Sequence, residues 1–209
     1  KLIKQVYSFK KREYTDFEMA FWRKFGINIE ILKKYNVAAI EVFCNTNKEG
    51  KLYTVKSESD KFIFGYDNGN WLKLYKPLDE KQFRFQYLGV KEPGYIFGWQ
   101  QLPDKSELIF ITGGEKDVMT LAAMGFNAIS LNSETASLDK NIVDELVNRF
   151  DKIIILYDND QTGLKQSELL TSKHNLHRIV LPEIPNNGKD ISDFIAQGGT
   201  REKLLDIIS

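Results

Sequence analysis

The stretch KIIILYDNDQTG, residues 152–163, decides the fold of the second half of this chain. Five apolar or aromatic residues run directly into two aspartates one residue apart, Asp158 and Asp160, and a glycine follows. A short apolar run of this kind is typical of a strand buried on both faces of a sheet. Carboxylates at the end of a buried strand are costly unless something compensates their charge. The stretch therefore predicts a buried strand that ends in an acidic turn, and the two carboxylates of that turn are expected to have a functional role.

Strand-like runs and helical patterns alternate on both sides of this stretch. The other predicted strands are ELIFIT (107–112), NAISL (127–131) and LHRIVLP (176–182). The predicted helices are EKDVMTLAAMG (115–125), DKNIVDELVNRF (139–150), TGLKQSELLTSK (162–173), ISDFIAQ (191–197) and TREKLLDII (200–208). Continuous apolar strands that alternate with helices favour a parallel sheet covered by helices on both faces. Ligands of such sheets collect at the carboxyl ends of the strands.

The first half of the chain has a different pattern. Two helix-like segments, YTDFEMAFWRKFGI (14–27) and NIEILKKYNV (28–37), precede a series of short aromatic-rich runs. These runs are IEVFC (40–44), KLYTV (51–55), KFIFGYD (61–67), WLKLYKP (71–77) and FRFQYL (83–88). Short runs separated by Asn, Gly and Asp predict antiparallel hairpins. We therefore expect a basic α+β subdomain over residues 1–104 and an α/β domain over residues 105–209.

Composition excludes several classes of protein. A length of 209 residues with 42% hydrophobic content is enough for one large or two small cores. No apolar run approaches the roughly 20 residues that a membrane helix needs. Cys44 is the only cysteine, so neither a disulfide framework nor a zinc ribbon is expected. These features predict a cytoplasmic protein without a membrane partner. The formal charge is +6 over residues 1–100 and −6 over the rest, which suggests two different tasks.

Acidic residues follow three of the four predicted strands. Glu115 lies just after the first strand, Asp158 and Asp160 end the third, and Asp190 follows the fourth with Asp193 three residues later. Because the carboxyl ends of parallel strands share one edge, these carboxylates could meet. Each acid also has a purely structural explanation, as a helix cap or as a charge at the positive end of a helix. Together they favour a site for Mg²⁺ or Mn²⁺, which prefer oxygen ligands.

Three segments in this order resemble the Toprim domain: ITGGEKDVMTLAAMGFNAISLNSE, IILYDNDQTG and GKDISDF. The Toprim domain is shared by bacterial-type primases, topoisomerases and some nucleases. Its signature is a glutamate after the first strand and a D-x-D after the third, which Glu115, Asp158 and Asp160 match. GGEKDVMTL is most similar to the primase version, where Asp117 would be the aspartate two residues after the glutamate. The resemblance covers about residues 106–195 and implies a Rossmann-like parallel sheet.

The first half is similar, more loosely, to the basic subdomain that precedes Toprim in phage-type primases and primase-helicases. In WLKLYKP and KQFRF the cations Lys73, Lys76, Lys81 and Arg84 alternate with aromatic rings. Alternation along a strand predicts charges on one face and rings on the other. The cations could hold phosphates of the template or of a nucleoside triphosphate, although a solvated amphipathic hairpin would look the same. The chain has neither a zinc module nor a G-x-x-x-x-G-K-[ST] loop. A replicative helicase, or fused helicase and zinc-binding modules outside this chain, is an expected partner.

The resemblance implies the catalytic core of a DNA primase, which makes short RNA primers on single-stranded DNA from nucleoside triphosphates. Glu115, Asp158 and Asp160 would then be catalytic and bind metal with support from Asp190, and Lys116 and Lys189 would contact phosphates. A Toprim nuclease would use the same acids. DNDQT also fits the D-x-D-x-T pattern of a phosphatase, but Glu115 would then have no role. A nucleic-acid-binding module without activity is the remaining alternative.

Overall fold

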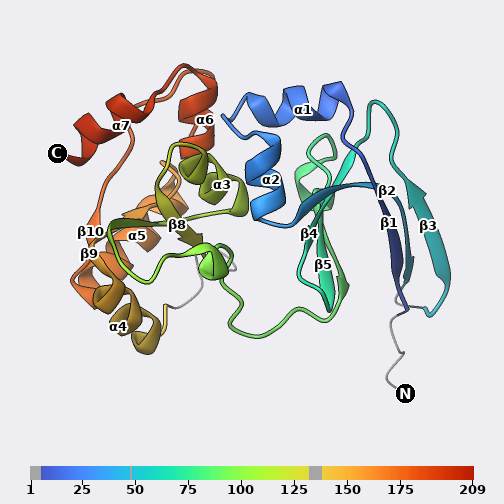
Figure 1. Cartoon of the computed structure of the whole chain (residues 1–209), viewed down its shortest axis with the longest axis horizontal. Coiled ribbons are helices and arrows are strands. Elements are labelled where there is room, and N and C mark those ends of the chain that lie inside the picture. Colours follow the sequence, from blue (N-terminus) through green and yellow to red (C-terminus); the bar gives the residue numbers. More distant parts are fainter. Residues whose placement is uncertain (1–5, 48, 132–137) are drawn as a thin grey trace. The chain divides into compact units, whose positions relative to one another are not determined.

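The computed structural model describes residues 6–47, 49–131 and 138–209 (Figure 1). The chain divides into two compact units. The first unit consists of Lys1–Phe21 and Leu32–Pro93, and the second of Trp22–Ile31 and Gly94–Ser209. No helix among the described residues is both long enough and apolar enough to cross a membrane. We propose that the two functional domains meet along the chain between residues 104 and 105.

The first unit contains an antiparallel sheet with strand order β1-β2-β4-β5-β6, and β3 also pairs with β2. The strands are β1 (Ser8–Arg12), β2 (Val37–Thr46), β3 (Leu52–Lys56), β4 (Ile63–Asp67), β5 (Trp71–Tyr75) and β6 (Phe85–Gly89). Helices α1 (Asp16–Arg23) and α2 (Ile29–Lys34) contain the residues at which the chain passes between the two units. The hairpin-rich pattern predicted for this region is confirmed. Strand β1 was not predicted, because its sequence SFKKR has no apolar alternation.

One hydrophobic cluster of the first unit lies on one face of this sheet, and the opposite face buries Phe64 and Trp71. The cluster contains the buried side chains of Ile40, Phe43, Ile63, Leu72, Leu74 and Leu88. A buried ion pair ties β1 to α1, because both guanidinium amino groups of Arg12 donate to Glu18, at 2.7 and 2.8 Å. The backbone N–H of Thr15 donates to the same carboxylate at 2.8 Å. Glu18 is fully buried, so these donors replace the water that its charge has lost.

The second unit contains a parallel four-stranded sheet with strand order β10-β9-β7-β8. The strands are β7 (Ser106–Thr112), β8 (Asn127–Ser130), β9 (Phe150–Leu156) and β10 (His177–Arg178). The helices are α3 (Glu115–Ala123), α4 (Lys140–Arg149), α5 (Gln161–His174), α6 (Ile191–Ala196) and α7 (Arg201–Ile208). The predicted mixed α/β fold with a parallel sheet flanked by helices is confirmed. The fourth strand is shorter than predicted, because ladder pairing with β9 covers only two residues.

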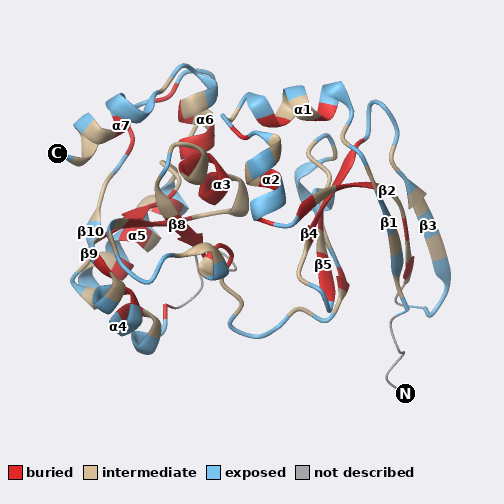
Figure 2. Ribbon diagram, in the orientation of Figure 1, coloured by how far each residue is buried: buried red, intermediate tan, exposed pale blue. Residues whose placement is uncertain are grey.

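Side chains from both faces of the parallel sheet are buried, and Figure 2 colours each residue by how far it is buried. Alternate residues of β7 and β9, such as Ile109, Ile111 and Ile155, form one cluster with side chains of α4 and α5. Residues of the opposite parity, such as Phe110 and Ile154, are also fully buried. Helix α3 packs against β7, β8 and α6 and contributes nothing to the first cluster. Burial on both faces explains why these strands are continuous apolar runs in the sequence.

Candidate metal centre

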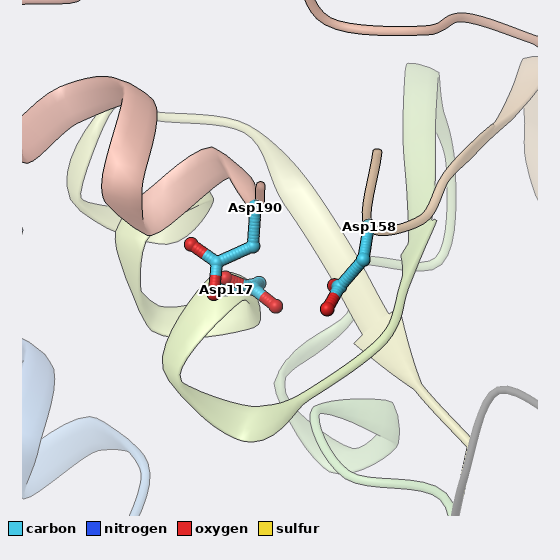
Figure 3. Close-up of side chains that lie close together, drawn as sticks. All are labelled: Asp117, Asp158 and Asp190. Carbon is cyan, nitrogen blue, oxygen red and sulfur yellow. The ribbon is translucent and has the colours of Figure 1, made fainter. Parts of the chain in front are cut away.

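Three aspartates from separate segments of the second unit meet beyond the carboxyl ends of β7 and β9. They are Asp117 in the first turn of α3, Asp158 two residues after β9, and Asp190 directly before α6. One carboxylate oxygen of each lies within 4.8 Å of the others (Figure 3). Among the described residues, no other set of three or more acidic, His or Cys side chains lies close enough together to hold a metal ion.

Local backbone contacts bring the segments of Asp158 and Asp190 together. The N–H of Asn159 donates to the carbonyl oxygen of Lys189 at 2.7 Å, which joins the turn after β9 to the loop before α6. Gly163, in the first turn of α5, packs directly on the backbone of Asp158. A Cβ atom at Gly163 would lie only 2.1 Å from the carbonyl oxygen of Asp158. The glycine of the DNDQTG motif is therefore a steric requirement for placing Asp158.

Asp117 is the most buried member of the group, at 5% exposure. The hydroxyl of Ser192 donates to Asp117 Oδ1 at 2.6 Å, and Ser192 Oγ lies 3.1 Å from Thr120 Oγ1. Burial raises the pKa of Asp117 well above its usual value, and the nearby charge of Asp190 raises it further. The packing of α3 against α6 therefore buries a carboxylate whose negative charge is destabilising on its own. A bound cation would compensate that charge, so this carboxylate is a candidate metal ligand.

Two lysines neutralise part of the acidic group. Lys189 Nζ lies 2.5 Å from Asp158 Oδ2 and donates to Asp160 Oδ2 at 2.8 Å. Lys116 Nζ lies 3.5 Å from Asp190 Oδ2. The hydrogen bond from Lys189 lowers the pKa of Asp160, whereas burial raises the pKa of Asp190 despite the charge of Lys116. Both lysines predicted to contact phosphates therefore lie next to the candidate site.

The structure places the predicted acidic residues in different roles. Asp158 and Asp190 belong to the group of three, together with Asp117, which was not among the predicted ligands. Asp160 caps α5, because its Oδ1 accepts from the N–H of Gly163 at 2.9 Å, and it also accepts from Lys189. Glu115 is the first residue of α3 and is not a member of the group. That Glu115 and Asp160 bind metal stays a prediction.

The donor set fits a small divalent cation. Two oxygens bound to the same Mg²⁺ lie at most about 4.2 Å apart, since Mg–O distances are 2.0–2.1 Å. Oxygens within 4.8 Å of one another therefore need to move by only a fraction of an ångström to share one ion. Ligands that are carboxylate oxygens alone favour Mg²⁺ or Mn²⁺ over softer metals.

The four basic residues predicted to bind nucleic acid or nucleotide lie in the first unit. Lys73 is on β5, Lys76 follows β5, Lys81 begins a 3₁₀ turn (Lys81–Phe83), and Arg84 precedes β6. The prediction that alternation separates charges from rings is wrong for Lys73, because Lys73 Nζ lies 4.4 Å from the centre of the Phe85 ring. Residues 71, 73 and 75 of β5 have the same parity, so Lys73 shares its face with aromatic residues.

Comparison with known proteins identifies the fold. The Toprim-like family matches residues 110–195. The primase fragment of the bacteriophage T7 primase-helicase is 19% identical over 90% of this chain and 73% of its own, with a TM-score of 0.62. The DnaG primase catalytic domain bound to ssDNA is 15% identical over 90% of this chain and 72% of its own, with a TM-score of 0.65.

A third similar structure holds the zinc-binding and RNA polymerase domains of the Aquifex aeolicus primase. It is 16% identical over 93% of this chain but only 55% of its own length, with a TM-score of 0.64. No curated protein matches this chain. Residues 110–195 therefore form a Toprim-like domain, and both units together have the fold of primase catalytic cores. The predicted resemblance to Toprim-domain primases is confirmed.

Proposed function

We propose that this chain is the catalytic core of a DNA primase, which synthesises short RNA primers on single-stranded DNA from nucleoside triphosphates. The observation that carries the proposal is the convergence of Asp117, Asp158 and Asp190 at the carboxyl edge of a Toprim-like sheet. Support also comes from the structures that share the fold, one bound to ssDNA and another to an RNA/DNA hybrid and dTTP. The activity and the partners of the whole enzyme are part of what we propose.

The three aspartates would hold Mg²⁺ or Mn²⁺. A divalent cation supplies positive charge for the α-phosphate and for the leaving pyrophosphate of nucleotidyl transfer. Ser192 keeps the Asp117 carboxylate in place through its hydrogen bond. Glu115, on the first turn of the same helix, is proposed either to bind metal or to help deprotonate the attacking 3′-hydroxyl.

Two lysines are close enough to the aspartates to bind phosphate. Lys116 and Lys189 already contact carboxylates of the site and would contact triphosphate oxygens when a nucleotide enters. Asp160 orients Lys189 through their hydrogen bond, in addition to its proposed role as a ligand. Lys73, Lys76, Lys81 and Arg84 are proposed to contact template or nucleotide phosphates. A helicase, fused or separate, is the proposed partner in a replicating cell.

The test is a primer-synthesis assay with labelled nucleoside triphosphates on single-stranded DNA, with and without Mg²⁺ or Mn²⁺. Asp158→Asn should abolish incorporation while far-UV circular dichroism stays unchanged. Asp144→Asn is the matched control, because Asp144 is an exposed aspartate of α4 whose ion pair with Lys140 is also exposed. Incorporation by Asp158→Asn at the wild-type rate would refute the proposal. Metal-dependent cleavage of the template without incorporation would support a Toprim nuclease instead.

A further inference from the structure

The outer edge of the antiparallel sheet carries a strip of exposed aromatic side chains. Phe83, Phe85 and Tyr87 fall within five residues of one another and are 57%, 48% and 36% exposed. Phe83 ends the 3₁₀ turn before β6, and Phe85 and Tyr87 lie on β6. Scattered exposed apolar residues are common, but a group of exposed apolar side chains close together is a feature of binding surfaces. We call these three residues the β6 aromatic strip.

The register of β6 places the rings of its strand residues on the face of the sheet opposite Leu88 and its cluster, next to the buried Trp71. Leu88 points into the buried cluster of the first unit, and Gln86 donates to the hydroxyl of Tyr53 at 2.5 Å on the same side. Phe85 and Tyr87 have the opposite parity and therefore lie on the other face. β6 is the last strand of the sheet, so no described strand pairs with its outer edge.

Lysines accompany the strip. Lys73 Nζ lies 4.4 Å from the centre of the Phe85 ring, and Lys91 Nζ lies 5.2 Å from the centre of the Tyr87 ring. Tyr75 on β5 stacks against Phe85, with ring centres 5.1 Å apart and planes inclined by 13°. The packing against Tyr75 fixes the orientation of the Phe85 ring, so little side-chain freedom would be lost when a flat ligand binds.

We propose that the β6 aromatic strip binds single-stranded nucleic acid by stacking with its bases, while the adjacent lysines contact the phosphates. Exposed rings bordered by cations are the arrangement that non-specific single-strand binders use. The rings of Phe85 and Tyr87 are about 7 Å apart along the strand, twice the rise per residue. That spacing is about twice the 3.4 Å between successive nucleotides in one strand of a duplex, which leaves room for unstacked bases.

The charge of the region selects this occupant over others. Residues 1–100 carry a formal charge of +6, which favours a polyanion. A duplex would offer its phosphates but not its base faces, so the rings would contribute little to duplex binding. The proposal rests on the proposed function for the identity of the strand, a DNA template, but the stacking itself depends only on this surface.

The test compares ring removal with ring retention in the full chain. Phe83→Ala, Phe85→Ala and Tyr87→Ala are combined in one variant, and Phe85→Tyr with Tyr87→Phe in a second that keeps every ring. Phe17→Ala is the matched control, because Phe17 is 76% exposed on α1 and lies outside the strip. Fluorescence anisotropy measures binding to a 16-nucleotide single strand and to the same strand with abasic sites.

Removal of the rings should weaken single-strand binding by about tenfold or more, since each stacked base contributes about 1–3 kcal/mol. The dependence of affinity on salt should not change, because no charge is removed. The ring-retaining variant and Phe17→Ala should bind like the wild type, and abasic sites should weaken the wild type but not the ring-removal variant. Equal affinity of the ring-removal variant and the wild type would overturn the proposal, as would wild-type indifference to abasic sites.

This test is separate from the test of the proposed function. A chain that needs the rings for single-strand binding but incorporates no nucleotide would retain the stacking surface and lose the primase assignment. A chain that incorporates nucleotides but binds equally well without the rings would retain the primase assignment and lose the stacking surface. Circular dichroism of the ring-removal variant shows whether any loss of affinity comes from a loss of fold.

Discussion

Lys189 occupies the place next to Asp158 where a metal ion would add positive charge, so its removal should strengthen metal binding. The substitution is Lys189→Met, which keeps an unbranched chain of similar length and removes the ammonium. Lys189 Nζ lies 2.5 Å from Asp158 and 2.8 Å from Asp160. An ion bound by Asp158 would therefore lie about 5 Å from this nitrogen, given Mg–O distances near 2.1 Å.

The magnitude follows from Coulomb's law. A divalent ion and an ammonium about 5 Å apart repel by roughly 1.7 kcal/mol even at the dielectric constant of water. That energy corresponds to a factor of about 17 in affinity. The Lys189 side chain is 43% exposed and can turn toward solvent when a cation arrives, which recovers part of the repulsion. We therefore expect Lys189→Met to bind Mg²⁺ or Mn²⁺ about tenfold more tightly than the wild type.

Isothermal titration calorimetry without nucleotide measures this affinity directly. Lys173→Met is the control, because Lys173 lies in the last turn of α5, about 20 Å along the helix from Asp160. At physiological ionic strength a charge at that distance is largely screened. In EDTA, where no metal is bound, Lys189→Met should also melt at a lower temperature than the wild type, because Asp158 and Asp160 lose the lysine that they share. Unchanged or weaker metal binding by Lys189→Met would show that its ammonium does not compete with the cation.

Two further substitutions test the burial of charge in each unit. Asp117→Asn should raise the melting temperature in EDTA at neutral pH. The gain should shrink as the pH falls, because burial raises the pKa of Asp117 above its usual value and protonation removes the buried charge from the wild type; a gain that does not depend on pH would contradict this explanation. Arg12→Ala should lower the free energy of unfolding by about 3 kcal/mol, because it leaves the buried Glu18 without its ion pair. Lys10→Ala breaks an exposed pair with Glu41 and should cost less than about 1 kcal/mol, and equal losses in urea titrations would refute the distinction.

Periodicity predicted most elements of the second unit because β7, β8 and β9 are buried on both faces. The centres of the runs that became β7 and β9 are apolar and give no signal of where the strands end. The polar residues and glycines of the neighbouring turns indicated those ends instead. Strand β1 was missed because three of its five residues are basic, and pairing with β2 rather than burial holds it in the sheet. The predicted fourth strand became two paired residues, since its remaining backbone leaves the ladder after a contact at Ile179.

The chemistry at the sheet edge was predictable from the sequence by itself. A buried strand must end somewhere, and the acids at the ends of parallel strands must share one edge. The sequence therefore determined that Asp158 and Asp190 belong near one site and that Gly163 would follow at a tight turn. It also determined the split between a basic and an acidic half, which requires no tertiary information.

Only the tertiary structure showed that Asp117 of α3 lies beside Asp158 and Asp190. Successive helical residues are rotated by about 100°, so Glu115 and Asp117 are about 200° apart around the helix axis, and the sequence does not say which of them lies nearer to the other two segments. The choice depends on the packing of α3 against α6, which places Ser192 beside Asp117. Likewise, only the register between β5 and β6 placed Lys73 over an aromatic ring. Rotation and register depend on contacts between distant segments, and a single sequence does not specify those contacts locally.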